Sequence, residues 1–382
     1  MSHRSRSALR ARTQALAILG TTLSLPGASV LTRIGREPTR SDTLVAGIST
    51  TVVRPATGPP WPALVFMNGA TPDGRSHPVV QRLGVALARA GIGVYIPDLP
   101  GVAGGELSPR TLACSVAVAE AAAGSADTAD GRIALAGVSI GGTLALLAAA
   151  DPRLQNRISV VACVAPFGDL AEVMRLATTG THRDGKQLGH HAAPPHLRVG
   201  LARSLAAMLP VTPATSALCR ELRELDPDSG RAVELPERAF REAGADAQRL
   251  YDLLANTDTA QFDRLYEALP VHVRSAAVSL SPIHVARHLH APVEIATAPQ
   301  DRYFPIAEAQ TLAAASPHVR LTVTSLLAHA TPRLSARYLA ELRRLDSFFL
   351  RSFRAATSGP PLQSVLEQTW SDPSGSLART RQ

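Results

Sequence analysis

Gly137-Val138-Ser139-Ile140-Gly141 is the stretch that decides the fold, because of the segments on either side of it. Residues 132–136 form a short apolar run typical of a buried strand, and residues 142–150 are rich in good helix formers. A glycine-x-serine-x-glycine turn between a strand and a helix is the context of a nucleophile elbow, whose serine projects above a sheet. Gly137 and Gly141 lack the Cβ atoms that would obstruct a close approach of strand and helix. The alternative is an inert glycine-rich turn.

The composition predicts a globular protein that does not bind nucleic acid. The chain has 382 residues, which allows one large domain or two, and its 45% apolar content supports a sizeable core. The net charge of +8 and the pI near 10.2 indicate an anionic partner at first sight. Nearly all the basic residues are arginines scattered among acids, however, and Lys186 is the single lysine. Aromatic residues make up only 4%, which leaves little material for base stacking.

The three cysteines, Cys114, Cys163 and Cys219, are widely spaced and form no C-x-x-C motif. We interpret each as a small buried apolar side chain in a reducing compartment, which favours a cytoplasmic protein. No motif supports a catalytic cysteine.

The N-terminal segment, residues 1–42, is apolar and basic. Four arginines precede an apolar stretch over residues 15–31, in the order found in a secretory signal. Threonine, serine, proline and glycine dilute this stretch, which is short and polar for a membrane span. It also suits a helix packed on the domain or lying on a membrane surface. The alternative to a cytoplasmic location is therefore secretion or membrane anchoring through residues 1–31.

Strand and helix patterns alternate over residues 43–170 and again over 281–355. The predicted strands are 43–55 (one or two), 63–67, 93–97, 132–136, 158–165, 292–297 and 319–324. The predicted helices are 77–90, 108–123, 142–150, 307–315 and 335–355. This alternation predicts an α/β protein with a mostly parallel, doubly wound sheet.

The alternation is interrupted by residues 171–280, whose pattern is helical with proline and glycine breaks. We interpret this segment as a helical lid insertion that covers the site and supplies an apolar pocket. The alternative is that its helices are integral to the core. The last residues, 356–382, are rich in serine, proline and glycine and are expected to be disordered.

The chain resembles the α/β-hydrolase superfamily over residues 43–170 and 281–355. Four segments in the right order carry the resemblance: 67–71, 97–101, 137–141 and 292–305. The Ser281-Pro282 pair is also similar to the dienelactone-hydrolase and prolyl-peptidase branches. The resemblance implies the α/β-hydrolase fold. It has one departure, since Asn68 stands where the family usually has histidine.

Acyl transfer requires a nucleophile, a base and an acid, and the chain offers them in the order Ser139, Asp301, His329. His329 lies on the loop after the last predicted strand and is placed to take the proton of Ser139. Asp301 lies on the loop after the preceding strand and is placed to orient the imidazole. The alternatives are a structural role for His329, a simple turn role for Asp301, and Asp169 as the acid.

A developing oxyanion requires two backbone N–H donors. We expect the first from Ile140, directly after the nucleophile, and the second from Ala70 or Thr71. Because the donors are backbone groups, Asn68 in place of histidine does not by itself remove the hole.

These residues predict a serine hydrolase that cleaves a carboxylic ester through an acyl-enzyme, with a small-molecule acyl substrate and without a cofactor or metal. Two histidine groups, at 190, 191 and 196 and at 284, 288 and 290, are interpreted as ordinary loop and helix positions. Peptidase, thioesterase and acyltransferase activity use the same triad and remain open. A non-catalytic binding protein of the same fold is the alternative from another class. Substrate identity and oligomeric state are left open.

Overall fold

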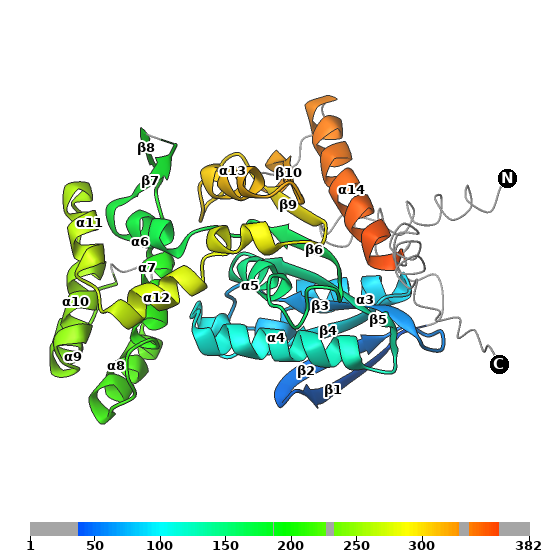
Figure 1. Ribbon diagram of the computed structural model, residues 1–382, viewed down its shortest axis with the longest axis horizontal. Helices are drawn as coiled ribbons and strands as arrows, with labels where there is room; N and C mark the ends of the chain where they lie inside the picture. The colour runs from blue at the N-terminus through cyan, green and yellow to red at the C-terminus, as the bar shows by residue number, and fades with distance from the viewer. Residues whose placement is uncertain (1–36, 186, 227–232, 328–335, 359–382) are drawn as a thin grey trace, which may run out of the picture.

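The computed structural model describes residues 37–185, 187–226, 233–327 and 336–358. Within this part of the chain, eight strands form one sheet in the order β1-β2-β4-β3-β5-β6-β9-β10 (Figure 1). The strands are β1 (Thr39–Val45), β2 (Ile48–Arg54), β3 (Trp61–Met67), β4 (Gly93–Pro97), β5 (Thr128–Val138), β6 (Ile158–Val164), β9 (Val293–Thr297) and β10 (Val319–Val323).

The sheet is parallel from β4 to β10, and β2 runs antiparallel to both β4 and β1. The mostly parallel sheet predicted from the sequence is therefore confirmed. The region predicted as one or two strands at 43–55 is a pair of strands, and it begins earlier, at Thr39. Since the carboxyl ends of the parallel strands share one edge, the loops that follow β3, β5, β6 and β9 meet there.

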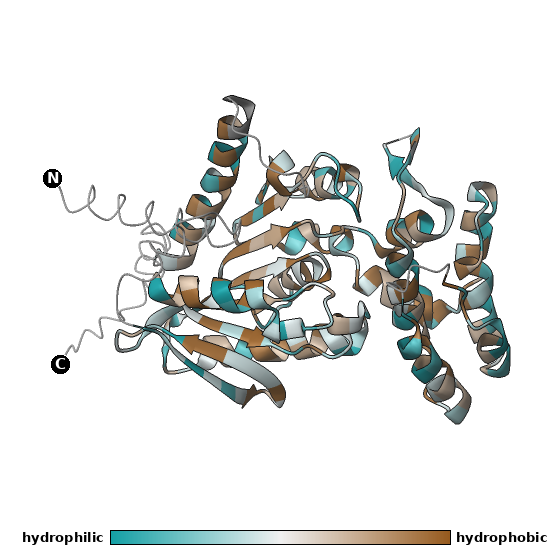
Figure 2. Cartoon of the chain, turned by 180° about the vertical axis from the view of Figure 1, so that it is seen from behind, coloured by the Kyte–Doolittle hydropathy of each residue, from teal (hydrophilic) through white to brown (hydrophobic). Residues whose placement is uncertain are grey.

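Helices cover both faces of the sheet, because side chains alternate along buried strands. On β3, Leu64 and Phe66 pack with α3 (Pro78–Arg89) and α14 (Ala336–Thr357). Val65 and Met67 belong to the opposite face, which α4 (Pro109–Gly124), α5 (Ile140–Ala149) and α13 (Ile306–Ala315) cover. Figure 2 shows apolar residues along the strands and also on the helices beside the sheet. The last helix continues two residues past its predicted end.

The helical insertion lies between β6 and β9 and extends from the carboxyl edge of the sheet (Figure 1). Its helices are α6 (Leu170–Thr179), α7 (Pro195–Ala206), α8 (Pro213–Glu224), α9 (Glu237–Glu242), α10 (Ala245–Leu254), α11 (Thr259–Glu267) and α12 (Val271–Ser279). The expectation of a purely helical pattern is wrong at one place, the hairpin of β7 (Thr181–Asp184) and β8 (Gln187–His190). Gly180 and Gly185 both have positive φ, which glycine adopts easily. Gly180 ends α6, and Gly185 lies in the turn between β7 and β8.

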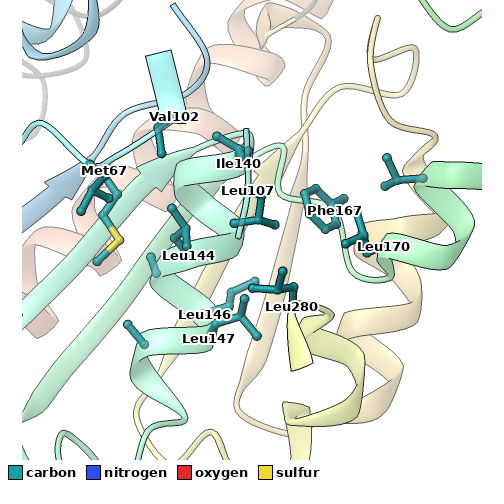
Figure 3. Packing of buried hydrophobic residues seen from close by; sticks show 14 of the residues in the cluster. Met67, Val102, Leu107, Ile140, Leu144, Leu146, Leu147, Phe167, Leu170 and Leu280 are labelled. Carbon is teal, nitrogen blue, oxygen red and sulfur yellow. The ribbon is translucent and has the colours of Figure 1, made fainter. Parts of the chain in front are cut away.

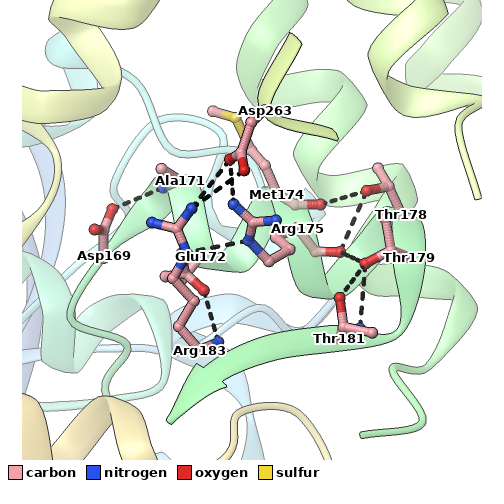
Figure 4. Close-up of polar contacts among 10 residues, drawn as sticks. All are labelled: Asp169, Ala171, Glu172, Met174, Arg175, Thr178, Thr179, Thr181, Arg183 and Asp263. Carbon is pink, nitrogen blue, oxygen red and sulfur yellow. Dashed lines mark hydrogen bonds and ion pairs between the residues drawn. The ribbon is translucent and has the colours of Figure 1, made fainter. Parts of the chain in front are cut away.

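A buried arginine ties the insertion together (Figure 4). The Arg175 side chain is 4% exposed and donates to Asp263 at 2.5 Å and to Glu172 at 3.4 Å. Its guanidinium also lies 4.2 Å from the centroid of the Phe262 ring. Arg183 joins the same two carboxylates, so α6, α11 and β7 share one ionic network.

The insertion and the sheet share one hydrophobic core. Leu201 and Leu205 of α7 and Leu250 of α10 are fully or almost fully buried and belong to the same apolar cluster as Leu144 of α5. Burial on this scale stabilises both parts at once, at about 25 cal/mol per Å² of apolar surface. This packing favours the alternative that the insertion is integral to folding.

Residues 1–36 and 359–382 lie outside the described residues, so the predictions for the N-terminal segment and for the tail fall largely on them. Among the helices that the structure describes, none is both long and apolar enough to cross a membrane.

The cysteines differ from one another. Cys163 is completely buried, its thiol donates to the Gly142 carbonyl oxygen, and burial raises its pKa well above the ordinary value. A thiol held in this way is inert. Cys114 and Cys219 are only half-buried, so the prediction of three buried side chains is wrong for these two.

Candidate active site

Ser139 occupies a strained turn between β5 and α5. Its backbone has φ 53° and ψ −126°, a conformation that residues with a Cβ rarely adopt. The Ser139 N–H donates to the Val164 carbonyl oxygen on β6 at 2.8 Å, which fixes the turn against the neighbouring strand. Strand, strained serine and helix follow one another as an elbow requires.

The two glycines of the motif are required by the close approach of the backbone. A Cβ on Gly141 would lie 2.1 Å from the Met67 carbonyl oxygen, at the end of β3. A Cβ on Gly137 would lie 2.3 Å from the carbonyl oxygen of Gly141. Non-bonded atoms cannot approach so closely, so a residue with a Cβ does not fit at either position. This close approach is the role that the sequence predicts for both glycines.

We expect Gly141→Ala to lower the free energy of unfolding by about 4 kcal/mol or more, because the new methyl group meets rigid backbone on β3. Urea denaturation followed by circular dichroism measures the loss. Gly58→Ala is the matched control, since nothing lies within 4 Å of its added Cβ, and it should change stability by less than about 0.5 kcal/mol. Equal stabilities for the two variants would contradict the packing described here.

A cavity of about 250 Å³ opens beside Ser139. It is mostly apolar and is bounded by the elbow, the loop after β3, the segment after β6, the loop after β9, and α7. The lining residues are Ala70, Gly105, Leu107, Val138, Ser139, Ile140, Phe167, Leu170, Val173, His196, Leu197, Gly200, Leu201, Ser204, Tyr303 and Phe304. No Asp, Glu, Lys or Arg is among these described residues, which suits an uncharged acyl group.

Helix α7 of the insertion is a fixed wall of this cavity. A Cβ on Gly200 would lie 2.9 Å from the Gly105 carbonyl oxygen, so helix and loop are in backbone contact. Nearby, the Leu107 N–H donates to Ser204 Oγ at 2.9 Å, and Arg203 donates to the Gly104 carbonyl oxygen at 2.7 Å. These contacts join α7 to the loop that follows β4.

His196 and Tyr303 are polar lining residues that the sequence reasoning missed. Their rings pack at 5.0 Å between centroids, which brings the start of α7 against the loop that carries Asp301. His196 stood in a proline-rich segment with no motif around it. Only the path of the insertion back over the sheet brings it to the cavity, and no spacing in the sequence signals that path.

Asp301 lies at the turn predicted for the acid. Its Oδ1 accepts hydrogen bonds from the N–H groups of Tyr303 at 2.8 Å and Phe304 at 3.1 Å. No described residue bonds to Oδ2, which leaves that oxygen available for an imidazole N–H. Asp301 therefore shapes the loop that lines the cavity and can still orient a histidine.

Asp169, the rival acid, is engaged elsewhere. It is the N-cap of α6, and its Oδ1 accepts from the Ala171 N–H at 2.8 Å (Figure 4). The same oxygen lies 3.4 Å from Ser281 Oγ. These contacts assign Asp169 a structural role at the base of the insertion, while its role as an acid remains a prediction to be tested.

The remaining predicted residues fall into two groups. His329 lies outside the described residues, and its role as the base stays a prediction. Ala70 and Ile140 line the cavity together with Ser139, and Thr71 is not among the lining residues. The N–H of Ile140 belongs to the first turn of α5 and has no acceptor within the helix.

The loop after β3 approaches the elbow closely. A Cβ on Gly69 would lie 3.1 Å from the Val138 carbonyl oxygen, so the glycine before Ala70 permits that approach. Asn68 is 6% exposed, and its Oδ1 has no hydrogen-bond partner among the described residues. The place of the usual histidine is thus taken by a buried amide beside the predicted oxyanion donors.

The described residues contain no group of three His, Cys, Asp or Glu side chains that converge as metal ligands would. Both histidine groups considered above belong to this part of the chain.

A family model described as the alpha/beta hydrolase family matches residues 64–346, well over half of the chain. No curated protein matches the chain.

Several solved structures are similar in fold. An acylaminoacyl peptidase in complex with Z-Gly-Gly-Phe-chloromethyl ketone has TM-score 0.50 and 11% identity, over 89% of this chain and 46% of that one. The dipeptidyl peptidase 4 of Porphyromonas gingivalis has TM-score 0.46 and 14% identity, over 85% and 37%. Est1E from Butyrivibrio proteoclasticus has TM-score 0.45 and 15% identity, over 83% and 99%. The chain thus spans less than half the length of the two peptidases. At these identities the likeness concerns the fold alone.

Proposed function

Since the chain belongs to the alpha/beta hydrolase family and is a hydrolase, we propose that it is a serine hydrolase that cleaves a carboxylic ester through an acyl-enzyme on Ser139. The observation that carries the proposal is the place of Ser139, a strained serine at the start of α5 that faces an uncharged cavity. A serine held in this conformation without a chemical role would be a cost to the fold.

The reaction assigns one task to each residue. His329 removes the proton from Ser139 Oγ as the oxygen attacks the ester carbonyl carbon, and Asp301 holds the imidazole and stabilises its charge. The N–H groups of Ile140 and Ala70, or Thr71 in place of Ala70, stabilise the oxyanion. The alcohol leaves with the proton that His329 had taken from Ser139. His329 then takes a proton from water as the water attacks the acyl-enzyme, and it returns that proton to Ser139 Oγ as the carboxylic acid leaves.

The cavity supports a short, uncharged acyl group as substrate. The cavity of about 250 Å³ beside Ser139 has no charged residue among its described lining residues, so it can take up an uncharged acyl chain. The helical insertion acts as the lid that sets this size, through α7 and its contact with the loop after β4.

The test is a panel of p-nitrophenyl esters from acetate to dodecanoate. We expect kcat/KM to rise with chain length while methylene groups fill the cavity, and to fall by about tenfold or more once the chain is longer than the cavity can hold. Thioesters and peptide amides of the same acyl groups are assayed beside the esters. Faster turnover of either would assign the activity to that class.

A non-catalytic binding protein is the other outcome of the panel. The feature that motivates this outcome is the buried Oδ1 of Asn68, which has no hydrogen-bond partner among the described residues. If the folded protein binds the esters and hydrolyses none of them, the chain is a binding protein and not an enzyme. For partners, we propose the small acyl substrate and no nucleic acid. A membrane surface or an export signal at residues 1–31 stays a separate proposal.

A further inference from the structure

The two ends of the helical insertion meet at a neck, formed by residues 167–171 and 280–283. The N–H of Leu170 donates to Ser281 Oγ at 2.8 Å, and the N–H of Ile283 donates to the Gly168 carbonyl oxygen at 3.0 Å. Ser281 is 1% exposed and also donates to the Ala277 carbonyl oxygen of α12. The neck therefore joins the start of α6 to the end of α12 beside the sheet.

Glu308 of α13 connects this neck to the core. Its Oε2 accepts hydrogen bonds from the N–H groups of Gly168 at 2.7 Å and Asp169 at 3.0 Å. The side chain is buried, and its two donors are consecutive backbone groups that secondary structure does not satisfy. One carboxylate oxygen thus fixes the orientation of two successive peptide planes.

The backbone held in this way carries two walls of the Ser139 cavity. Phe167 precedes Gly168 and Leu170 follows Asp169, and both residues line the cavity. Figure 3 shows their side chains close to each other. On the other side, Phe167 exchanges hydrogen bonds with Thr143 Oγ1 in α5, the helix that Ser139 begins. The segment is therefore fixed to the nucleophile helix at one end and to Glu308 and Ser281 at the other.

We propose that Glu308 is a positioning residue that holds Phe167 and Leu170 in the cavity and thereby selects the acyl group. The proposal rests on the hydrolase function of Ser139. Among the described residues, the Glu308 carboxylate accepts hydrogen bonds from the backbone of Gly168 and Asp169, so its effect on the cavity passes through the neck backbone. Removing the carboxylate releases two N–H groups and lets both walls move.

Because Glu308 is ionisable, its positioning role can be tested by the pH dependence of KM. A residue with only a structural role would not change that dependence. Burial raises the pKa of Glu308 from 4.5 to about 7; its hydrogen bonds from Gly168 and Asp169 oppose the shift, and the charges of Asp169 and Glu172 add to it. Three further groups on the adjoining turns η3 (Pro282–His284) and η4 (Ala286–His288) are exposed to solvent and act weakly through it: His284, Arg287 and His288. With its pKa raised to about 7, the protonated fraction of Glu308 increases as the pH falls from 8 to 6. The ionised form accepts the two N–H bonds more strongly.

The experiment compares wild type, Glu308→Gln and Glu308→Ala on p-nitrophenyl acetate, whose acyl group reaches little of the cavity, and on p-nitrophenyl hexanoate, whose longer chain extends along its walls. For wild type we expect KM for the hexanoate to rise about fivefold as the pH falls from 8 to 6, because the neutral carboxyl holds the neck less tightly. In Glu308→Gln, the amide oxygen of the new side chain accepts the same two bonds and does not titrate. That variant should therefore keep the fold and show no such rise.

Glu308→Ala should raise KM for the hexanoate about tenfold and leave kcat for the acetate within about twofold. If that variant fails to fold, the pH comparison between wild type and Glu308→Gln still decides. Glu267→Gln, an exposed position on α11, is the matched control and should behave as wild type. A KM that keeps its pH dependence in Glu308→Gln, or equal effects on both esters, would overturn the positioning role.

A fluorophosphonate probe separates this result from failure of the proposed function. If Ser139 labels in every variant and the KM pattern is absent, only the role of Glu308 is wrong. If Ser139 does not label in folded wild type, the hydrolase function at this serine is wrong.

Discussion

Ser139→Ala is expected to lower kcat for ester hydrolysis by about 10,000-fold or more, because no other group can form the acyl-enzyme. The fold should survive, since alanine keeps the Cβ and the Ser139 hydroxyl has no hydrogen bond to another described residue. The measurement is turnover of the best ester of the panel, beside a urea denaturation curve for the same sample.

Ser76→Ala is the control for this result, because Ser76 is exposed on the loop after β3 and outside the cavity. It should keep turnover within about twofold and stability within about 0.5 kcal/mol of wild type. Residual turnover of Ser139→Ala within about tenfold of wild type would mean that another nucleophile, or an activated water, carries the reaction.

Asp301→Asn is expected to cut kcat by about 10,000-fold and to leave the fold intact, because an amide cannot hold the imidazole tautomer or stabilise its charge. The amide oxygen of the introduced asparagine can still accept from the N–H groups of Tyr303 and Phe304. The loop should therefore keep its shape, and the loss in kcat reports the chemistry of the triad.

Asp169→Asn is the matched variant on the rival acid. The amide oxygen can keep the N-cap bond to Ala171, so we expect turnover within about threefold of wild type. If Asp169→Asn is inactive and Asp301→Asn is active, the acid has been assigned to the wrong strand. Asp301 is then only a turn residue.

The sequence predicts the α/β core closely, because its signals are local. Consecutive apolar residues at 63–67 mark β3 as buried on both faces, and the structure places β3 in the middle of the sheet. The two elbow glycines follow from the same local geometry, and the contacts that a Cβ would make at Gly137 and Gly141 explain them. Most strand and helix boundaries agree within a few residues for the same reason.

Local sequence patterns predict the insertion less well than the core. The helical pattern does not predict the β7–β8 hairpin. The hairpin depends on the positive φ of Gly180 and Gly185, which the periodicity of apolar residues does not reveal. The places of His196 and Glu308 are not predicted either, because both residues make contacts with distant parts of the chain. The hydrogen bond between Glu308 and Gly168 is an example. Long-range contacts of this kind depend on how the insertion returns to the sheet.

The role of Ser139 as the nucleophile is tested most directly by the mass of the protein after reaction with a fluorophosphonate, followed by peptide mapping. We expect one adduct per chain, located on Ser139 and absent from Ser139→Ala. Folded protein that gains no adduct, or that gains it on a serine other than Ser139, would show that the elbow does not carry the nucleophile.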